Sequence, residues 1–313
     1  MTTWRHFFFG TAAFALTACA EMPSSNMPDT GAPLTTPAPT QTAELSETSL
    51  LLTDYYKRVQ DRLLAQGLLR VDGGGADTPF TDTMLARNFV RIALFDEYTN
   101  QNGVLQAQTT LSKLRRWDKP VRMSLQFSDT TPARVQAADT EFIAAFNARL
   151  SRLTGLPVTL TSVRPNFHVL IVNEDDRRGM ADTLRTLLPG LSPSSLSYAL
   201  NLPREQWCVA IGVFEPDGVT YDRVVAIIRA EHPDLMRQTC IHEEVAQGLG
   251  LANDSRQARP SIFNDDEEFG FLTRQDELML QMLYDDRFTI GMSAAEAAPL
   301  ARRIATELMG GEV

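Results

Sequence analysis

Two apolar runs near the middle of the chain constrain the fold most strongly. They are WCVAIGVF at 207–214 and VTYDRVVAIIRA at 219–230, and the turn signal Glu-Pro-Asp-Gly lies between them. β-Branched and aromatic residues favour strands, and Pro, Asp and Gly favour a turn. We therefore expect two strands here, so the fold is not expected to be all-helical.

Apolar residues at helical spacing predict several helices around these strands. The first covers 46–66 and is closed by Gly67, and the second begins at Thr81 and continues through the pattern at 81–98. Further helices are expected at 137–153 and 233–249, and from Thr273 to about 285; further strands are expected at 121–127, 158–161 and 168–172, whereas 181–200 is ambiguous. The order predicts an α+β fold with a mostly helical N-terminal part at 46–130.

The N-terminus has the pattern of an export signal. Arg5 precedes the apolar run FFFGTAAFALTA, which is too short for a comfortable transmembrane span. The run ends in Leu16-Thr17-Ala18-Cys19, which resembles the bacterial lipobox, where the cysteine thiol accepts a diacylglycerol before cleavage. We expect a signal peptide at 1–18 and lipidation of Cys19; a soluble export signal and a chance apolar start are the alternatives.

The segment after Cys19 predicts a tether. Residues 19–45 are rich in Pro, Thr and Ser and poor in large apolar residues, so they cannot form a core. The folded domain is then expected at 46–313. Ala20 and Glu21 follow the cysteine, without the Asp that commonly signals inner-membrane retention. We expect an outer-membrane anchor facing the periplasm, with the inner membrane as the alternative.

Charge narrows the possible partners. Lys and Arg number 29 against 39 Asp and Glu, which gives a net charge of −10 at pH 7. Such a chain has no global basic field to attract nucleic acid, so that class of partner is not expected. No second apolar run is long enough to span a bilayer. The expected partners are the membrane, through the lipid anchor, and an unidentified envelope protein.

Cysteine usage predicts one disulfide. The chain has three cysteines, and lipidation of Cys19 would leave Cys208 and Cys240 as a pair. An oxidising periplasm favours a disulfide between them. The alternative is two buried free thiols that pack as small apolar groups.

The stretch CIHEEVAQGLGLANDS at 240–255 gathers the residue types that could carry chemistry. A zinc peptidase needs two imidazoles four residues apart on a helix, with a carboxylate beside the first. His242 fails this test because Ala246 stands four residues on. Moving the zinc-helix pattern one residue along the sequence gives a better fit. Glu243, Gln247 and Asn253 then occupy the ligand positions, and Glu244 occupies the position of the catalytic base.

In that register the sequence resembles the metzincin peptidases. GLGLAND is similar to the GLGL-x-H segment that ends their zinc helix, and PSIF at 260–263 replaces their signature methionine with Phe263. LTRQDELMLQMLYD resembles their following helix, and the helix at 137–153 with TGLPVTL and HVLIVN resembles the start of a zincin catalytic half. The resemblance covers 137–290 and implies a zincin-like C-terminal half, with a mixed sheet and an active-site-type helix.

The mature chain also resembles a bacterial family known only as domain of unknown function 2927. The similar segments are ARNFVRIALFDEY, LRRWDKPVRMSL, CIHEEVAQGLGLAND, SIFNDD and MLYDDRFTIGM. That family is uncharacterised, so the resemblance implies no activity. It implies that Glu-Glu-x-x-Gln is the family's usual form.

The donor atoms weigh against a zinc centre. Carboxylate and amide oxygens replace the nitrogen donors that hold zinc, so no cofactor is expected. Calcium is one alternative, because Asp254 and the acidic loop NDDEEFG supply oxygen donors, although a solvated acidic loop explains that loop equally well. For His242 we expect a structural role over a proton-carrying one, and for Glu244 a hydrogen-bonding anchor over a general base.

These residues lead to one expectation about function. The chain is expected to be a lipid-anchored envelope protein whose degenerate zincin-like domain acts as a binding or structural module. A metal-dependent peptidase or hydrolase with Glu244 as general base is the alternative, and a calcium-stabilised scaffold is a third.

Overall fold

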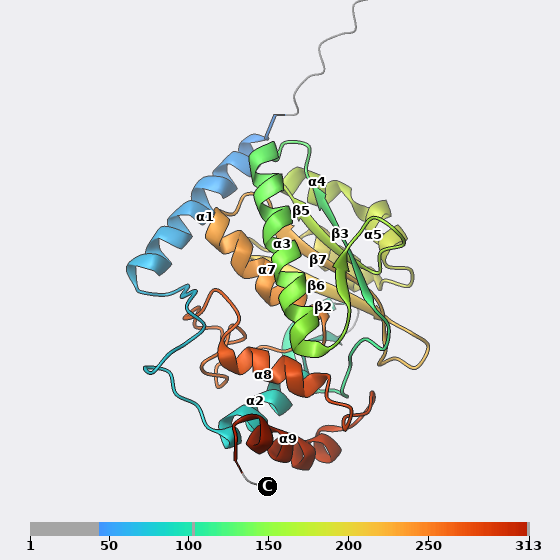
Figure 1. Cartoon of the computed structure of the whole chain (residues 1–313). Coiled ribbons are helices and arrows are strands. Elements are labelled where there is room, and N and C mark those ends of the chain that lie inside the picture. Colours follow the sequence, from blue (N-terminus) through green and yellow to red (C-terminus); the bar gives the residue numbers. More distant parts are fainter. Residues whose placement is uncertain (1–43, 102–103, 312–313) are drawn as a thin grey trace, which may run out of the picture. The chain divides into compact units, whose positions relative to one another are not determined.

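A computed structural model describes residues 44–101 and 104–311 (Figure 1). The predicted signal peptide, Cys19 and nearly all of the predicted tether lie outside these residues. No helix in the described part of the chain is long and apolar enough to cross a membrane. The helices are α1 (Glu47–Ala65), α2 (Asp82–Ala93), α3 (Ala133–Thr154), α4 (Glu174–Gly179), α5 (Ala181–Leu187), α6 (Pro193–Leu200), α7 (Asp234–Gly248), α8 (Arg274–Leu283) and α9 (Ala294–Leu308).

The strands form a hairpin and a mixed sheet. Their bounds are β1 (Phe95–Gln101), β2 (Val104–Leu111), β3 (Val121–Phe127), β4 (Val158–Leu160), β5 (Phe167–Val172), β6 (Cys208–Phe214) and β7 (Tyr221–Arg229). β1 and β2 pair with each other, and the larger sheet has the order β4-β3-β5-β7-β6. In that sheet β6 is antiparallel to β7, and the other neighbours are parallel. The expected α+β class is therefore confirmed.

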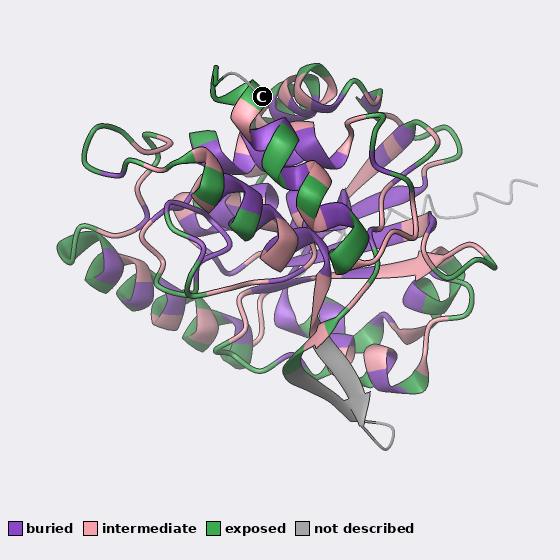
Figure 2. Cartoon of the chain, turned by 90° about the horizontal axis from the view of Figure 1, so that it is seen from below, coloured by how far each residue is buried: buried purple, intermediate pink, exposed green. Residues whose placement is uncertain are grey.

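Helices cover both faces of the larger sheet. β5 is buried along its whole length, and alternate side chains enter different clusters, as expected when successive residues point to opposite faces. Phe167, Val169 and Ile171 join the core that includes α3 and α7. Leu170 and Val172 join a second core with α5 and α6. Figure 2 shows buried residues along the strands and on the inward sides of the helices.

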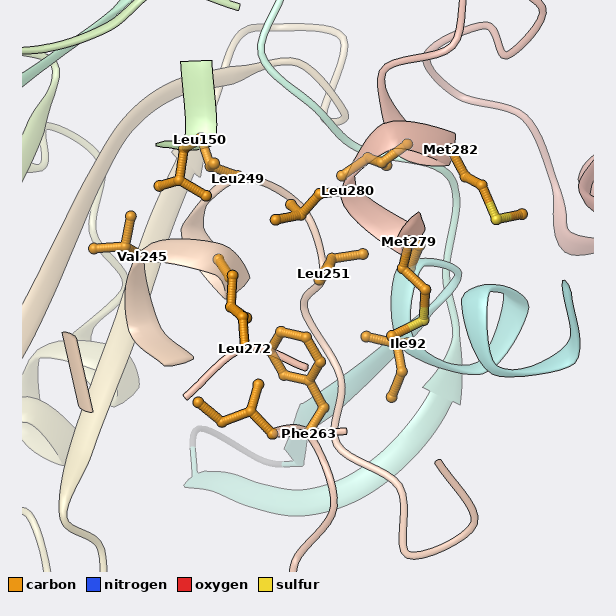
Figure 3. Packing of buried hydrophobic residues seen from close by; sticks show 14 of the residues in the cluster. Ile92, Leu150, Val245, Leu249, Leu251, Phe263, Leu272, Met279, Leu280 and Met282 are labelled. Carbon is orange, nitrogen blue, oxygen red and sulfur yellow. The ribbon is translucent and has the colours of Figure 1, made fainter. Parts of the chain in front are cut away.

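The larger core continues beyond the sheet. Leu249 and Leu251 follow α7 and pack beside Phe263, residues of α8 and Ile92 of α2 (Figure 3). α2 also lies along α9, whose small residues Ala297, Ala301 and Ala305 are fully buried. One continuous apolar cluster thus connects the sheet, α7, α8, α2 and α9.

Most expected elements are present, but several differ from the prediction. The pattern at 81–98 predicts a helix beginning at Thr81, and Thr81 is indeed the N-cap of α2. However, α2 ends at Ala93, and Phe95 begins a strand. The hairpin of β1 and β2 was not predicted, so the part at 46–130 is less helical than expected. Helix α9 was not predicted either.

Candidate functional site: an acidic cleft between β6 and α7

A cleft of about 300 Å³ lies between the edge strand β6 and the second half of α7. One wall is β6, through Ala210, Ile211 and Gly212, and the other is α7. We call it the acidic cleft and define it by five residues: Glu97 of β1, Glu243, Glu244 and Gln247 of α7, and Asp254 of the loop that follows.

A disulfide joins the two walls of the acidic cleft. Cys208 begins β6 and Cys240 lies in the middle of α7, and their sulfurs are 2.03 Å apart. The predicted disulfide is therefore confirmed. Glu243 and Glu244 follow Cys240 by about one helical turn, so the bond holds their backbone beside β6.

Electrostatic repulsion dominates the acidic cleft. Burial raises the pKa of Glu243 well above its ordinary value, and the charges of Asp254, Glu244, Glu267 and Glu97 raise it further. The pKa of Asp254 is also raised well above its ordinary value, by burial and by Glu97 and Asp265, although a hydrogen bond from Gln247 opposes the shift. The carboxylates repel one another in a setting that solvates them poorly. A cation in the cleft would relieve that repulsion.

Glu244 is the most deeply placed of these carboxylates, with only 3% of its surface exposed. Burial, Glu97 and Asp254 raise its pKa well above the ordinary value, and a hydrogen bond from the Ala210 backbone opposes the shift. Its Oε2 atom has no hydrogen-bond partner within the described part of the chain. A buried carboxylate oxygen without a partner is costly, so this atom is one to which a ligand would bind favourably.

The acidic cleft continues into a neighbouring cavity of about 210 Å³, which shares Glu97, Glu243, Glu244 and Asp254. Asn264 and Glu267 line this second cavity. Asn264 is 6% exposed, and its Oδ1 has no partner among the described residues. Burial and the charges of Asp265 and Asp266 raise the pKa of Glu267 to about 7. A second oxygen donor without a partner therefore stands beside the same carboxylates.

Of the two remaining predicted ligand positions, Gln247 reaches the acidic cleft and Asn253 lines neither cavity. Gln247 lines the cleft, where its Nε2 donates to Asp254 Oδ1 at 3.1 Å. Asn253 faces α2 instead: its Nδ2 donates to the Arg91 carbonyl at 2.8 Å, and its backbone N–H donates to the Ile92 carbonyl. The structure thus does not bring Asn253 to a shared metal position with Glu243 and Gln247.

His242 lies outside the cleft. Its ring stacks on Phe146 and Phe271, at centroid distances of 4.0 and 4.4 Å, and its Nδ1 accepts a hydrogen bond from the Leu272 backbone. Burial, with a smaller effect from Arg149, lowers the pKa of His242 to about 3, so the ring is neutral. These contacts give His242 a packing role and leave it no part in the cleft.

The donor set of the cleft does not fit zinc. Among the described residues no histidine lines either cavity, and the sulfur near Glu243 and Glu244 belongs to the disulfide and cannot act as a thiolate. A hard cation fits better. One oxygen each from Glu243 and Glu244 lie within 4.8 Å of each other. Calcium binds oxygens at about 2.3–2.6 Å, so one ion between the two would contact both.

Sequence reasoning missed Glu97. It lies on β1, and the polar strands FDEYTNQ and VLQAQTTL lack the apolar alternation that identifies a hairpin. Nothing local to residue 97 therefore indicated that it approaches α7. Asn264 was missed as well, because an unpartnered buried amide oxygen can be recognised only from three-dimensional contacts.

Comparison with known proteins places the chain in a family. A family described as a protein of unknown function, DUF2927, matches residues 82–303, which is more than half of the chain. The chain belongs to this family. Glu97, Glu243, Glu244, Asp254 and Glu267 all fall inside the matched segment. No curated protein and no solved structure matches the chain.

Proposed function

We propose that this DUF2927 protein is a lipid-anchored envelope protein whose acidic cleft binds a hard divalent cation, with calcium as the ion tested first. In this proposal the domain acts as a binding or structural module and does not hydrolyse a substrate. The observation that carries it is the buried Oε2 of Glu244, unpartnered among the described residues and surrounded by carboxylates that repel one another.

Oxygen donors and their spacing support this choice of ligand. Glu243 and Glu244 would supply one oxygen each; Asp254 lines both cavities and Asn264 lines the neighbouring one, and both can contribute directly or through water. Bound calcium would also replace the protons that the raised pKa values favour, so binding would release protons.

Calcium titration of the chelator-treated full chain tests this function. We expect saturable binding by calorimetry and a raised melting temperature, because a ligand at a hundredfold excess over its Kd stabilises the folded state by about 2.7 kcal/mol. Glu243→Gln and Glu244→Gln should each abolish the shift. Glu141→Gln, at an exposed position on α3, is the matched control and should retain it. Binding that persists in both cleft variants, or no binding at all, would contradict the proposal.

The membrane anchor has its own test. The proposal of an outer-membrane anchor rests on the LTAC segment at 16–19 and on the polar residues that follow it. Metabolic labelling with a palmitate analogue should mark the wild-type chain and leave Cys19→Ala unlabelled, and fractionation should then find the variant outside the membrane. Labelling that is equal in both chains would reject the anchor without affecting the cation site.

A second candidate function is a hydrolase with Glu244 as general base. The raised pKa of Glu244 and its position in an open cleft favour this candidate. Hydrolysis of a peptide library by the calcium-loaded or zinc-loaded chain, lost in Glu244→Gln and kept in Glu141→Gln, would support it over the binding module.

A further inference from the structure

A further cavity, separate from the acidic cleft and from the cavity beside it, lies where the parallel strands β3, β5 and β7 end. Its volume is about 500 Å³. Thr130 and Thr131 follow β3, Asn173 follows β5, and Glu231 and His232 follow β7; all of them line the cavity. We call it the strand-end cavity.

The topology of the sheet singles out this position. The chain leaves β3 through α3 toward β4 on one side, whereas it leaves β5 toward β6 and β7 on the other. Ligands of open α/β sheets bind outside the carboxyl ends of parallel strands, where successive connections diverge in this way. The strand-end cavity occupies that crevice, and α1 lines its outer side through Ser49, Thr53 and Lys57.

Two long helices begin at the strand-end cavity with a proline at the N-cap position, and at α7 the only side-chain acceptor for the first turn within the described residues is Gln60 Oε1, which accepts from the Met236 N–H at 3.2 Å. Pro132 precedes α3 and Pro233 precedes α7, and neither provides a capping hydrogen bond. Both prolines line the cavity. The first N–H groups of a helix have no partner within the helix and carry partial positive charge, so they favour an anion.

Three residues that line the cavity each carry a buried polar atom without a partner in the described part of the chain. Thr131, Glu231 and His232 are 8%, 4% and 3% exposed, and all three line the cavity. Thr131 Oγ1, Glu231 Oε2 and His232 Nε2 have no hydrogen-bond partner within the described residues. Three such atoms in one cavity point to a polar ligand, because buried polar groups are almost always paired.

Most of the charged side chains around the cavity are paired with one another. The acidic side chains of Asp234 and Asp139 pair with Arg237, and Asp61 pairs with Lys57. Arg134 also lines the cavity, near the start of α3, and has no ion pair among the described residues.

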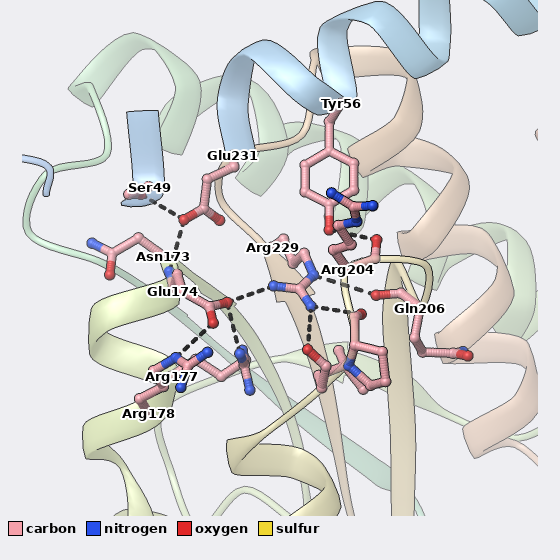
Figure 4. Close-up of polar contacts among 12 residues, drawn as sticks. Ser49, Tyr56, Asn173, Glu174, Arg177, Arg178, Arg204, Gln206, Arg229 and Glu231 are labelled. Atoms are coloured by element: carbon pink, nitrogen blue, oxygen red, sulfur yellow. Dashed lines mark hydrogen bonds and ion pairs between the residues drawn. The ribbon is translucent and has the colours of Figure 1, made fainter. Parts of the chain in front are cut away.

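Glu231 is the remaining carboxyl group. Its Oε1 accepts from Ser49 Oγ at 2.5 Å and from the Glu174 backbone N–H at 2.7 Å (Figure 4). Burial raises its pKa, which favours the protonated form, and the hydroxyl of that form can donate to a ligand. Its Oε2 has no hydrogen-bond partner within the described residues, and Glu231 and Thr131 both line the strand-end cavity.

We propose that the strand-end cavity binds the oxyanion head, a carboxylate or phosphate, of a small polar molecule. The first two backbone N–H groups of α3 and of α7 and the Arg134 guanidinium hold the charge, and Thr131 Oγ1 donates a hydrogen bond to it.

The test uses inorganic phosphate and succinate as probes, with the full chain in calcium-free buffer. Amide resonances of Ala133, Arg134, Asp234 and Leu235 are followed by NMR. We expect saturable shifts at both helix starts, and at least fivefold weaker binding in Thr131→Val and Arg134→Gln. Saturable shifts with phosphate alone would identify the head as a phosphate, and saturable shifts with succinate alone would identify it as a carboxylate. Shifts with both probes would show that the cavity accepts either group.

Two control variants make the test decisive. Arg152→Gln removes an exposed arginine from the far end of α3, and Thr159→Val removes an exposed threonine hydroxyl from β4; both should bind as the wild type does. Glu244→Gln should also leave binding unchanged, because it lies in the acidic cleft. The absence of saturable shifts with either probe, or unchanged affinity in both cavity variants, would overturn the proposal.

Discussion

At the scale of single residues, Glu244 has the environment that departs most from that of an exposed carboxyl group. A carboxyl whose pKa is higher in the folded than in the unfolded state stabilises the fold below its unfolded pKa. That stability is lost as pH rises through the folded pKa. Glu243, Glu244 and Asp254 all have raised pKa values, and that of Glu267 is raised to about 7. The contribution of these four carboxyl groups to the stability of the cation-free protein should therefore fall as pH rises from about 4.5 to beyond 7, whereas the lowered pKa of His242 acts in the opposite direction below about pH 6.5.

Glu244→Gln tests this dependence directly. The amide keeps an acceptor for the Ala210 N–H and removes a buried charge, so in cation-free buffer at pH 8 the variant should be about 1–2 kcal/mol more stable than wild type. At pH 4.5 the two should be equal. Urea unfolding at both pH values gives the comparison, with Glu141→Gln as control. A variant that is less stable at pH 8 would show that the charged carboxylate has a favourable partner.

Asp276 is a second residue whose role can be isolated, because two capping boxes allow a comparison. Asp276 lies in the first turn of α8, is fully buried, and accepts hydrogen bonds from Ser261 Oγ, the Ile262 N–H and both donors of Thr273. Glu296 forms the equivalent box at the start of α9, where it bonds only Ser293 at an exposed position.

Removing each carboxylate should therefore have unequal effects. Asp276→Ala leaves several buried donors unpaired and should lower the free energy of unfolding by about 2–4 kcal/mol. Glu296→Ala should cost about 1 kcal/mol or less. Chemical denaturation of the two variants measures both values, and equal losses would show that the buried bonds of Asp276 add little to its cap.

At the scale of elements, local signals in the sequence were sufficient to predict the N-caps of α2 and α8 and the disulfide. Thr81 and Thr273 are threonines followed by apolar residues at helical spacing, and both are N-caps in the structure. The position of β1 could not be predicted in the same way, because its pairing with β2 and its approach to α7 depend on the rest of the fold. Helix α9 was missed because its buried face consists mainly of alanines, and Pro299 interrupts the helical pattern.

The contribution of the disulfide between β6 and α7 to the free energy of unfolding can be measured on its own. It closes a loop of 32 residues, and cross-linking a loop of that length restricts the unfolded chain enough to stabilise the fold by about 3–4 kcal/mol. The double variant Cys208→Ala/Cys240→Ala should therefore unfold at lower urea with its circular dichroism spectrum unchanged. Reduction of the wild type should give the same loss. Calcium affinity should fall as well, because β6 and α7 form the two walls of the acidic cleft.

At the scale of the whole molecule, the fold class followed from the sequence, whereas the site did so only in part. Patterned strands and helices predicted α+β, and the segment at 240–255 drew attention to Glu243, Glu244 and Asp254, which line the acidic cleft. The comparison with the zinc-helix pattern also assigned Asn253 as a ligand position, but the side chain of Asn253 bonds the backbone of α2. The packed molecule determines which side chains are buried, which oxygens lack a hydrogen-bond partner, and that Glu97 approaches α7. No local sequence pattern indicates these properties.

The two ends of the described chain should contribute differently to the cooperativity of folding. α9 belongs to the continuous core that also contains the sheet, α7 and α8, whereas α1 packs in a separate small cluster of Tyr56, Val59, Leu63, Leu69 and Met236. Removing residues 293–313 should expose the buried face of α2 and break the single core. We expect that truncated chain to bind hydrophobic dye and to lose a cooperative thermal transition.

Removing residues 1–66 provides the comparison. This truncation deletes α1 and its bonds to Glu231 and to the Arg204 carbonyl, but leaves the larger core intact. The shortened chain should still unfold in one cooperative transition, at a lower temperature than the full chain, and should keep calcium binding while losing affinity for phosphate or succinate. Calorimetry of the two truncations distinguishes the cases. The prediction would be wrong if the chain without α9 still unfolded cooperatively, or if the chain without α1 did not.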